Sequence, residues 1–225
     1  MRLRNIPAAR PAVEQNPYCI QDATDHKGCW RDVFLNGHPL RIELGMGKGR
    51  FILTQAIEHT DINFLGLERY ESVMYRAVKR LESEFTDGDR LLLPNLRLIC
   101  CDAAELAGFF AKGEVERIFL NFSDPWPKER HAKRRLTSHR FLAEYEKVLP
   151  DGGMVEFKTD NVGLFDFSRE EITARPHWEI LDLTDDLHAL PSDHKLLADN
   201  IMTEYEEKFA SEGKPIHKLA AVYHE

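Results

Sequence analysis

The sequence predicts an α/β fold in which a mostly parallel β-sheet is covered by helices on both faces. From residue 40 to residue 223, short apolar runs alternate with segments of helical periodicity, the order that produces parallel strands joined by helices. The runs are almost continuously apolar, as expected of strands that are buried on both faces. The chain has 225 residues, of which 43% are hydrophobic, enough for one sizeable core.

The first half of the chain alternates three predicted strands with three predicted helices. "LRIEL" (40–44) is a short apolar run that leads into glycines, and a helical pattern follows at 50–59. "INFLGLE" (62–68) has the length of a strand, and Glu71–Phe85 repeats its apolar residues at the spacing of a helix. After a loop that contains Pro, "LRLICCD" (96–102) is the third strand, and a short helix follows at 103–110.

The second half continues the same alternation. "VERIFLNF" (115–122) is an apolar strand, residues 137–149 predict a helix, and "PDGG" turns the chain into "MVEFKTD" (154–160). A helix at 161–174 precedes the strand "HWEILDL" (177–183). A last helix near 200–211 leads through "EGKP" into the terminal strand "IHKLAAVY" (216–223).

We expect one domain over residues 36–225, because no repeat or low-complexity linker interrupts it. Residues 1–35 are rich in Pro and Arg, so we expect an irregular and partly disordered N-terminal arm.

Several classes of protein are disfavoured. The N-terminus lacks the apolar core of a signal peptide, and no apolar stretch approaches the length of a membrane helix. The four cysteines, Cys19, Cys29, Cys100 and Cys101, form neither a disulfide framework nor a C-x-x-C motif. We therefore expect a cytoplasmic protein with no membrane contact and no metal.

Charge is distributed unevenly along the chain. The formal net charge is −8, yet Lys128–Arg135 contains five Lys or Arg residues and one Glu, a local charge of +4. A run of this kind is either a solvated face or a surface for phosphate groups.

A glycine turn follows the first predicted strand, in "IELGMGKGRF". A turn stripped of side chains between a strand and a helix lets a ligand approach the backbone. The motif is not a P-loop, and a dinucleotide fingerprint that starts at Gly45 would need its third glycine where Arg50 stands. Glu43 would repel a pyrophosphate but suits a cationic ligand. S-adenosylmethionine, with a sulfonium, an ammonium and no phosphate, fits that turn.

Acids end the next two strands. Glu68 lies 23 residues after Gly45 (68 − 45), close to the spacing at which an acid binds ribose hydroxyls in doubly wound folds. Asp102 ends the third strand, where it could meet the adenine amino group. Strand-end acids also serve as helix caps, so each has a structural interpretation as well.

The fourth strand ends in Asp124-Pro125-Trp126-Pro127. Two prolines fix φ and remove two backbone donors, so the turn is stiff and can hold Asp124 in place for a substrate. Trp126 either stacks on a base or fills a hydrophobic gap. Later strand ends bring Lys158 and Asp160 to the same edge, and Thr203-x-x-Glu206 can be read simply as a helix capping box.

Taken together, "ELGMGKGRF", "SDPWPKERHAKRRL", "EFKTDN" and "TEYEEKFASEGKPIHKL" closely resemble the bacterial TrmB-type tRNA (guanine-N7)-methyltransferases from about residue 40 to the C-terminus. The resemblance implies a Rossmann-like class I methyltransferase fold, with a seven-stranded sheet whose last strand is antiparallel. It also implies S-adenosylmethionine as methyl donor, tRNA as partner, and N7 of guanine 46 in the variable loop as acceptor.

Carried over by position, the resemblance assigns four sets of residues. The catalytic residue is Asp124. Cofactor binding falls to Glu43, Gly45, Gly47, Glu68, Asp102 and Asp124. Substrate binding falls to Lys128, Asp160, Thr203, Glu204, Tyr205 and Glu206. RNA binding falls to Arg130, His131, Lys133, Arg134 and Arg135, with an arm through Arg2, Arg4 and Arg10. Glu129 stands where many relatives have another base, and this lowers the charge of the loop.

Three alternatives remain. A methyltransferase for an exocyclic base nitrogen uses a similar Asp/Asn-Pro-Pro-aromatic turn, but here Trp126 separates the prolines. A non-catalytic RNA-binding protein of the same fold is opposed by the acids at three strand ends, and a nicotinamide-dependent oxidoreductase by Glu43 and Arg50. The protein is expected to be a monomer or a homodimer.

Overall fold

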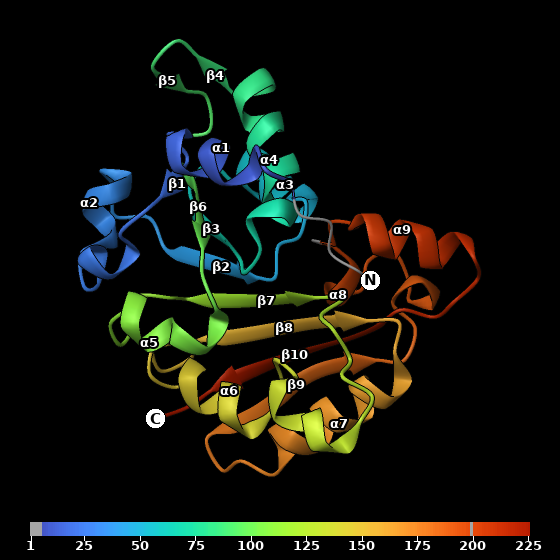
Figure 1. The fold of residues 1–225 in the computed structure, drawn as a ribbon. Helices are drawn as coiled ribbons and strands as arrows, with labels where there is room; N and C mark the ends of the chain where they lie inside the picture. Colours follow the sequence, from blue (N-terminus) through green and yellow to red (C-terminus); the bar gives the residue numbers. More distant parts are fainter. Residues whose placement is uncertain (1–5, 199) are drawn as a thin grey trace. The chain divides into compact units, whose positions relative to one another are not determined.

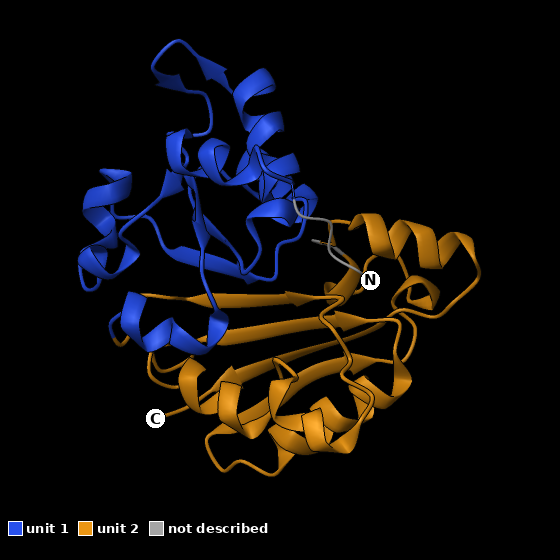
Figure 2. Ribbon diagram, in the orientation of Figure 1, with its two compact units in different colours: residues 1–111 blue, residues 112–225 orange. Residues whose placement is uncertain are grey.

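The computed structural model of the chain describes residues 6–198 and 200–225. The chain divides into two compact units, residues 1–111 and residues 112–225 (Figure 2). Arg2 and Arg4, expected in an RNA-binding arm, lie outside the described residues. The single domain predicted for 36–225 stays a prediction.

The first unit contains a parallel sheet with strand order β1-β6-β3-β2 (Figure 1). Its strands are β1 (Cys19–Ile20), β2 (Leu40–Leu44), β3 (Asn63–Glu68) and β6 (Leu96–Cys100). All six residues of β3 are buried, because neighbouring strands cover both of its edges and helices α3 (Arg50–Glu58) and α4 (Glu71–Glu84) pack on it. The predicted loop "GDRLLLPN" contributes to a small hairpin of β4 (Thr86–Asp87) and β5 (Arg90–Leu91).

The N-terminal segment differs from the sequence-based expectation. From residue 6 onward it contains α1 (Ala9–Gln15), β1, the 3-10 helix η1 (Ala23–His26) and α2 (Trp30–Phe34). Val13, Tyr18 and Trp30 are buried, and the Trp30 indole donates to the Phe109 carbonyl at 2.9 Å. Helix α1 packs on α4. These apolar contacts order the segment. Its α-helices have only five and seven residues, too few to show a clear helical periodicity in the sequence.

The second unit contains a mixed sheet with strand order β7-β8-β10-β9. β7 (Arg117–Asn121) and β8 (Met154–Thr159) are parallel, and β10 (His217–Tyr223) runs antiparallel to both β8 and β9 (Trp178–Thr184). The prediction of a mostly parallel fold with an antiparallel last strand is therefore confirmed. The seven predicted strands all form, and in the described part of the chain β1 and the hairpin strands β4 and β5 are additional.

Burial in the second unit follows strand position. Every residue of β10 is buried between its neighbours, whereas β9 at the edge alternates between covered and exposed residues. Helix α7 (Val162–Thr173) packs on β8, β9 and β10. The remaining helices of this unit are η3 (Glu129–Arg134), α6 (His139–Tyr145), η4 (Leu187–Ala189), α8 (Lys195–Ala198) and α9 (Glu204–Ser211).

Several predicted boundaries move by a few residues. β6 ends at Cys100, and the segment after it is a 3-10 turn η2 (Ala103–Glu105) followed by α5 (Leu106–Phe109). The basic segment, expected as a loop, is the 3-10 helix η3. The last helix begins at Glu204 rather than near Asn200, because Thr203 caps it. In the described part of the chain, no helix has the length and apolar character needed to cross a membrane.

Candidate active site

The glycine turn between β2 and α3 is built on left-handed backbone. Gly45, Gly47 and Gly49 have φ of 73°, 60° and 80°. A Cβ at Gly49 would lie 2.9 Å from the Ala77 Cβ, so this glycine is required for packing of α3 on α4. A Cβ at Gly45 or Gly47 would meet nothing within 4 Å. The first part of the turn is therefore an open backbone surface that a ligand can approach.

Two buried carboxylates belong to the strands that flank this turn in the sheet. Glu43 in β2 and Glu68 at the end of β3 are 2% and 8% exposed. Glu68 accepts hydrogen bonds from the backbone N–H groups of Gly47 and Tyr70, both at 3.1 Å. The acid expected to bind ribose thus also fixes the glycine turn. Buried carboxylates beside an open backbone surface fit a cationic nucleoside ligand such as S-adenosylmethionine.

Asp102 follows β6 and caps the next turn. Its Oδ1 accepts from the Ala104 N–H at 3.0 Å, and its Oδ2 lies 3.4 Å from the Arg69 guanidinium. Asp102 therefore caps the turn through its Oδ1, as the capping interpretation expects. Its side chain remains partly exposed. Burial raises the pKa of the neighbouring Cys100 thiol to about 11 and raises that of Cys101 further, which disfavours their thiolate forms.

In the second unit, the turn after β7 presents Asp124. Phe122 and Trp126 have φ of 51° and 42°, values that non-glycine residues rarely adopt and that surrounding contacts must maintain. The Phe122 N–H donates to the Lys158 carbonyl at 2.9 Å, which fixes the start of the turn on β8. Asp124 itself is exposed. The turn therefore holds this carboxylate toward solvent on a constrained backbone.

Trp126 lies beneath the basic segment rather than in the open. The Arg134 guanidinium stands 4.9 Å from its ring centroid, and the His131 ring meets it edge-on at 5.6 Å. Two residues of the predicted RNA-binding set thus pack on the turn that carries Asp124.

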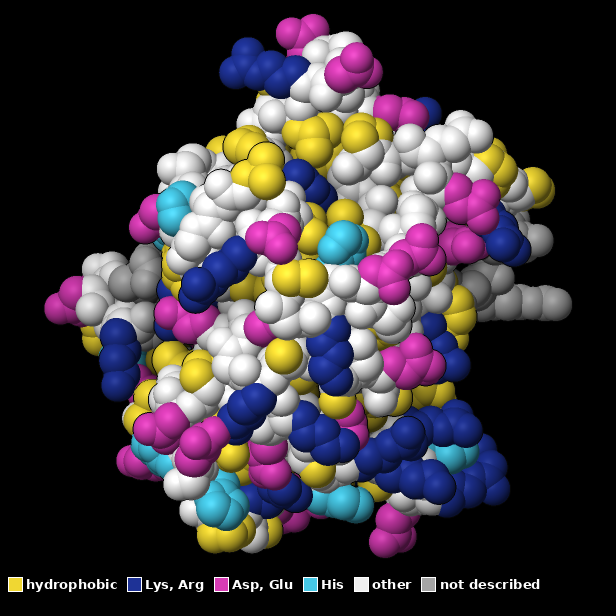
Figure 3. All heavy atoms as spheres, turned by 90° about the vertical axis from the view of Figure 1, so that its left-hand side faces the viewer, with side chains coloured by type: hydrophobic (Ala, Val, Ile, Leu, Met, Phe, Trp, Pro, Cys, Tyr) yellow, Lys and Arg dark blue, Asp and Glu magenta, His cyan; other side chains and the backbone are white. Residues whose placement is uncertain are grey.

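The basic segment exposes most of its cations. Lys128, Arg130, Lys133 and Arg134 are exposed, and His131 and Arg135 are half-buried. Figure 3 shows one face of the molecule on which Lys and Arg side chains gather in a dense cluster at the lower right, while Asp and Glu are scattered over the rest of that face. Among the described residues, no group of three or more His, Cys, Asp or Glu side chains is arranged to hold a metal ion.

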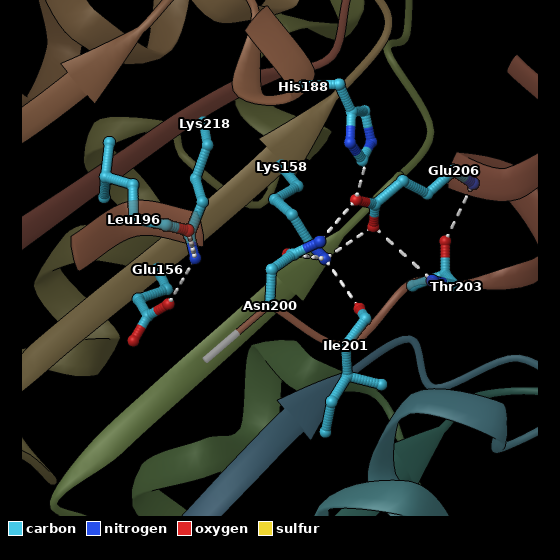
Figure 4. A network of polar contacts seen from close by, with 9 residues as sticks. All are labelled: Glu156, Lys158, His188, Leu196, Asn200, Ile201, Thr203, Glu206 and Lys218. Atoms are coloured by element: carbon cyan, nitrogen blue, oxygen red, sulfur yellow. Dashed lines mark hydrogen bonds and ion pairs between the residues drawn. The ribbon is translucent and has the colours of Figure 1, made fainter. Parts of the chain in front are cut away.

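A buried ion pair joins the end of β8 to the start of α9 (Figure 4). The Lys158 Nζ lies 2.7 Å from Glu206 Oε2, and the two side chains are 4% and 0% exposed. Lys158 also donates to Asn200 Oδ1 at 2.9 Å and to the Ile201 carbonyl at 3.0 Å. The pair therefore anchors the segment that leads into α9.

The Glu206 carboxylate is surrounded by protein donors. Besides Lys158, it accepts from the Asn200 amide at 2.7 Å and from the Thr203 N–H at 3.4 Å, and the His188 Nε2 lies 3.2 Å away. The Glu206 N–H donates to the Thr203 hydroxyl at 3.0 Å, which completes a capping box. The capping interpretation of Thr203-x-x-Glu206 is confirmed.

The outer residues of the same motif have a different environment. Glu204 is exposed, and Tyr205 is 49% exposed. The Tyr205 ring stacks on Phe122 and Phe209, with centroids 6.3 and 6.2 Å apart. Tyr205 thus offers a supported aromatic face close in sequence to the buried cap, and it reaches the turn of Asp124 through Phe122. Asp160, at the end of β8, is half-buried.

Several residues that build these sites carry no local sequence signal. Asn200 and His188 reach Glu206 from separate segments, and Lys218 in β10 donates to the Leu196 carbonyl at 2.9 Å while lying 3.3 Å from Glu156 (Figure 4). Burial by itself would raise the pKa of Glu156, but Lys218 and Arg117 outweigh it and lower that pKa.

Known proteins match this chain over nearly its whole length. A family model described as "Putative methyltransferase" matches residues 37–219. A protein of Lachnoclostridium phytofermentans named tRNA (guanine-N(7)-)-methyltransferase is 49% identical, over 98% of each chain. Proteins with the same name from Brevibacillus brevis and an Exiguobacterium species are 46% and 45% identical, over at least 98% of each chain.

Solved structures share the fold at low sequence identity. The 16S rRNA methyltransferase KamB superposes with a TM-score of 0.64 at 13% identity, covering 87% of this chain and 93% of that one. An antibiotic-related methyltransferase superposes with a TM-score of 0.62 at 14% identity, covering 92% of this chain and 96% of that one. The Rossmann-like class I methyltransferase fold is thereby confirmed.

Proposed function

This chain belongs to the family of tRNA (guanine-N(7)-)-methyltransferases, and we propose that it transfers a methyl group from S-adenosylmethionine to N7 of guanine 46 in the variable loop of tRNA. The observation that carries the proposal is local to the second unit. An exposed Asp124 stands on a constrained turn, and the exposed Arg134 of η3 packs on the Trp126 ring of that turn. This combination suits a nucleobase acceptor that is carried by a phosphate backbone.

The first unit supplies the residues for the cofactor. Glu43 and the open backbone at Gly45 and Gly47 would face the cationic methionine part. Glu68 would accept from ribose hydroxyls, and Asp102 from the adenine amino group. When bound, S-adenosylmethionine supplies an electrophilic methyl group on a sulfonium.

The acceptor requires little chemistry from the protein. Guanine N7 has a lone pair and no proton, so it can attack the methyl carbon in line without a general base. The N7–CH₃ bond forms, the S–CH₃ bond breaks, and the positive charge moves from sulfur to the base. The enzyme contributes orientation and electrostatic stabilisation. Asp124, which makes no hydrogen bond or ion pair with the described part of the chain, is available to stabilise this charge or to accept from guanine N1–H and N2–H.

The tRNA would contact two surfaces of the second unit. Lys128, Arg130, Lys133 and Arg134 are exposed for phosphate groups. Tyr205 offers its exposed ring for stacking, and Glu204 and Asp160 offer carboxylates for base edges. Thr203 and Glu206 serve the site by holding the start of α9, since their side chains are engaged in the capping box.

The proposal is tested with three tRNA transcripts and labelled S-adenosylmethionine. An unmodified tRNA should accept one methyl group, and nucleoside analysis should identify it as 7-methylguanosine. A transcript with 7-deazaguanine at position 46 has C–H in place of N7 and should accept none, while the same replacement at another guanine should leave acceptance intact. A methyl group on an exocyclic nitrogen, or no transfer to the unmodified transcript, would refute the proposal.

A further inference from the structure

Arg135, the last cation of the basic segment, has an environment unlike that of its neighbours. Lys133 and Arg134 are exposed, whereas Arg135 is half-buried. Its Nε donates to the Pro125 carbonyl at 3.0 Å, and its NH2 group donates to the Trp126 carbonyl at 3.2 Å. The guanidinium that sequence reasoning assigns to RNA is therefore directed at the turn that follows Asp124.

We propose that Arg135 is a positioning residue, which holds the Asp124-Pro125-Trp126-Pro127 turn in the conformation needed for methyl transfer. This inference rests on the proposed function of Asp124. The first reason is geometric. The planar guanidinium of Arg135 binds the carbonyls of two consecutive residues with two separate N–H groups, and a Lys ammonium cannot reproduce this forked geometry. Because φ of Trp126 is 42°, the turn needs such external contacts to keep its shape.

The second reason is that Arg135 is itself firmly seated. Its guanidinium carbon lies 4.3 Å from the centroid of the Phe167 ring in α7. Two residues further along, the Thr137 hydroxyl lies 2.6 Å from the Ser168 hydroxyl, and both side chains are buried. Ser168 in turn donates to the Leu164 carbonyl of α7 at 2.6 Å. Arg135 and its two bonds to the turn, which we call the clamp, thus connect the Asp124 turn to α7, and α7 packs on the sheet of the second unit.

The third reason is that the turn is held from both directions. Arg134 and His131 cover the Trp126 ring, and Arg135 binds the backbone of the same residue. Arg134 contacts the Trp126 ring but is exposed, so its guanidinium can still bind a phosphate. Arg135 is half-buried, and its Nε and NH2 groups are bonded to the Pro125 and Trp126 carbonyls, so its guanidinium is directed at the turn. Adjacent arginines thus have separate tasks: one for RNA and one for the turn.

The test compares Arg135→Lys with a matched change, Arg169→Lys, at an exposed arginine of α7. Arg135→Lys keeps the charge but loses the fork, so kcat at saturating tRNA should fall about 10- to 100-fold, the loss expected for a misplaced reactive group. The tRNA dissociation constant and its salt dependence should stay near wild type. Arg169→Lys should change neither quantity.

A spectroscopic measurement detects the clamp without activity. The chain has three tryptophans, Trp30, Trp126 and Trp178, so protein labelled with 5-fluorotryptophan should give three ¹⁹F resonances, assigned with Trp126→Phe. Arg135→Lys should shift the Trp126 resonance and leave the other two in place, which also shows that the variant is folded. If the wild type made no 7-methylguanosine, the proposed function would fail while this measurement still reported on the clamp.

Each other outcome overturns the inference. Weaker tRNA binding with a shallower salt dependence and unchanged kcat would make Arg135 a phosphate contact. A loss of kcat without a shift of the Trp126 resonance would mean that Arg135 acts on the substrate directly. A shifted resonance with wild-type kcat would mean that the turn does not need the clamp.

Discussion

The Lys158 ammonium and the Glu206 carboxylate form a buried ion pair, 2.7 Å apart, that joins the end of β8 to the start of α9. Lys158 immediately precedes Thr159 and Asp160, and Glu206 lies in the T-x-Y-E segment, so the pair connects two segments that family resemblance assigns to substrate binding. Such a pair costs desolvation free energy that only full hydrogen bonding offsets. Asn200, His188 and Thr203 complete that bonding here.

Lys158→Met should destabilise the protein strongly. The change leaves the fully buried Glu206 carboxylate without its cation, and broken buried pairs of this kind cost about 3–5 kcal/mol in free energy of unfolding. Urea denaturation measures the effect. Lys208→Met removes an exposed lysine of α9 that pairs with Glu212 and should cost under about 1 kcal/mol. Equal losses in free energy of unfolding in the two variants would show that the buried ion pair stabilises the protein no more than an exposed one.

Thr203→Ala should lower the free energy of unfolding by about 1 kcal/mol, since the hydroxyl accepts from the Glu206 N–H at 3.0 Å and caps α9. Thr203→Ser keeps the hydroxyl and should recover most of that loss. Thermal or urea unfolding of both variants gives the comparison. The capping role would be rejected if Thr203→Ala unfolded like the wild type.

Acid should destabilise the protein partly through Glu156. The pKa of Glu156 is lowered in the folded protein, so the unfolded chain binds its proton more readily, and the stabilisation is present above the ordinary Glu pKa of about 4.3. It is lost as the pH falls through the folded pKa. Glu156→Gln should therefore lose less free energy of unfolding than the wild type on acidification below about pH 5.

The control for this experiment is Glu179→Gln, at a side chain that is 65% exposed. Its acid dependence should match that of the wild type. An acid dependence of Glu156→Gln as steep as the wild type's would contradict the lowered pKa.

Lys133→Gln combined with Arg134→Gln should weaken tRNA binding, because both side chains are exposed on η3. Each lost phosphate contact should reduce the slope of log K against log salt by about 0.9 or somewhat less. Filter binding across a salt series measures the slope. Lys147→Gln changes an exposed lysine of the same unit and should leave the slope unchanged. An unaltered slope in the double variant would make the segment a solvated face.

Local patterns made much of this molecule predictable. Apolar runs, glycines and strand-end acids lie close together in sequence, so the turn at Gly45 and the acids Glu43, Glu68 and Asp102 could be placed before the structure was known. The same holds for the seven main strands, whose buried apolar runs are hard to mistake. The capping box at Thr203 also needs only four consecutive residues.

The remainder depends on contacts that the sequence does not encode locally. Lys158 and Glu206 are 48 residues apart, and nothing in either segment indicates the other. Arg135 shares one basic run with Arg134, yet a run of charges does not reveal which side chain turns inward. The N-terminal helices were missed because α1 and α2, at seven and five residues, are too short to show periodicity and are ordered by packing.

The central claim is that Asp124 interacts with the guanine that accepts the methyl group. Single-turnover methylation by the Asp124→Ala variant tests this claim most directly. With enzyme in excess over tRNA, the rate of 7-methylguanosine formation should fall by at least about 100-fold, while calorimetry should find S-adenosylmethionine bound within about threefold of the wild-type affinity. A single-turnover rate equal to that of the wild type would contradict the account.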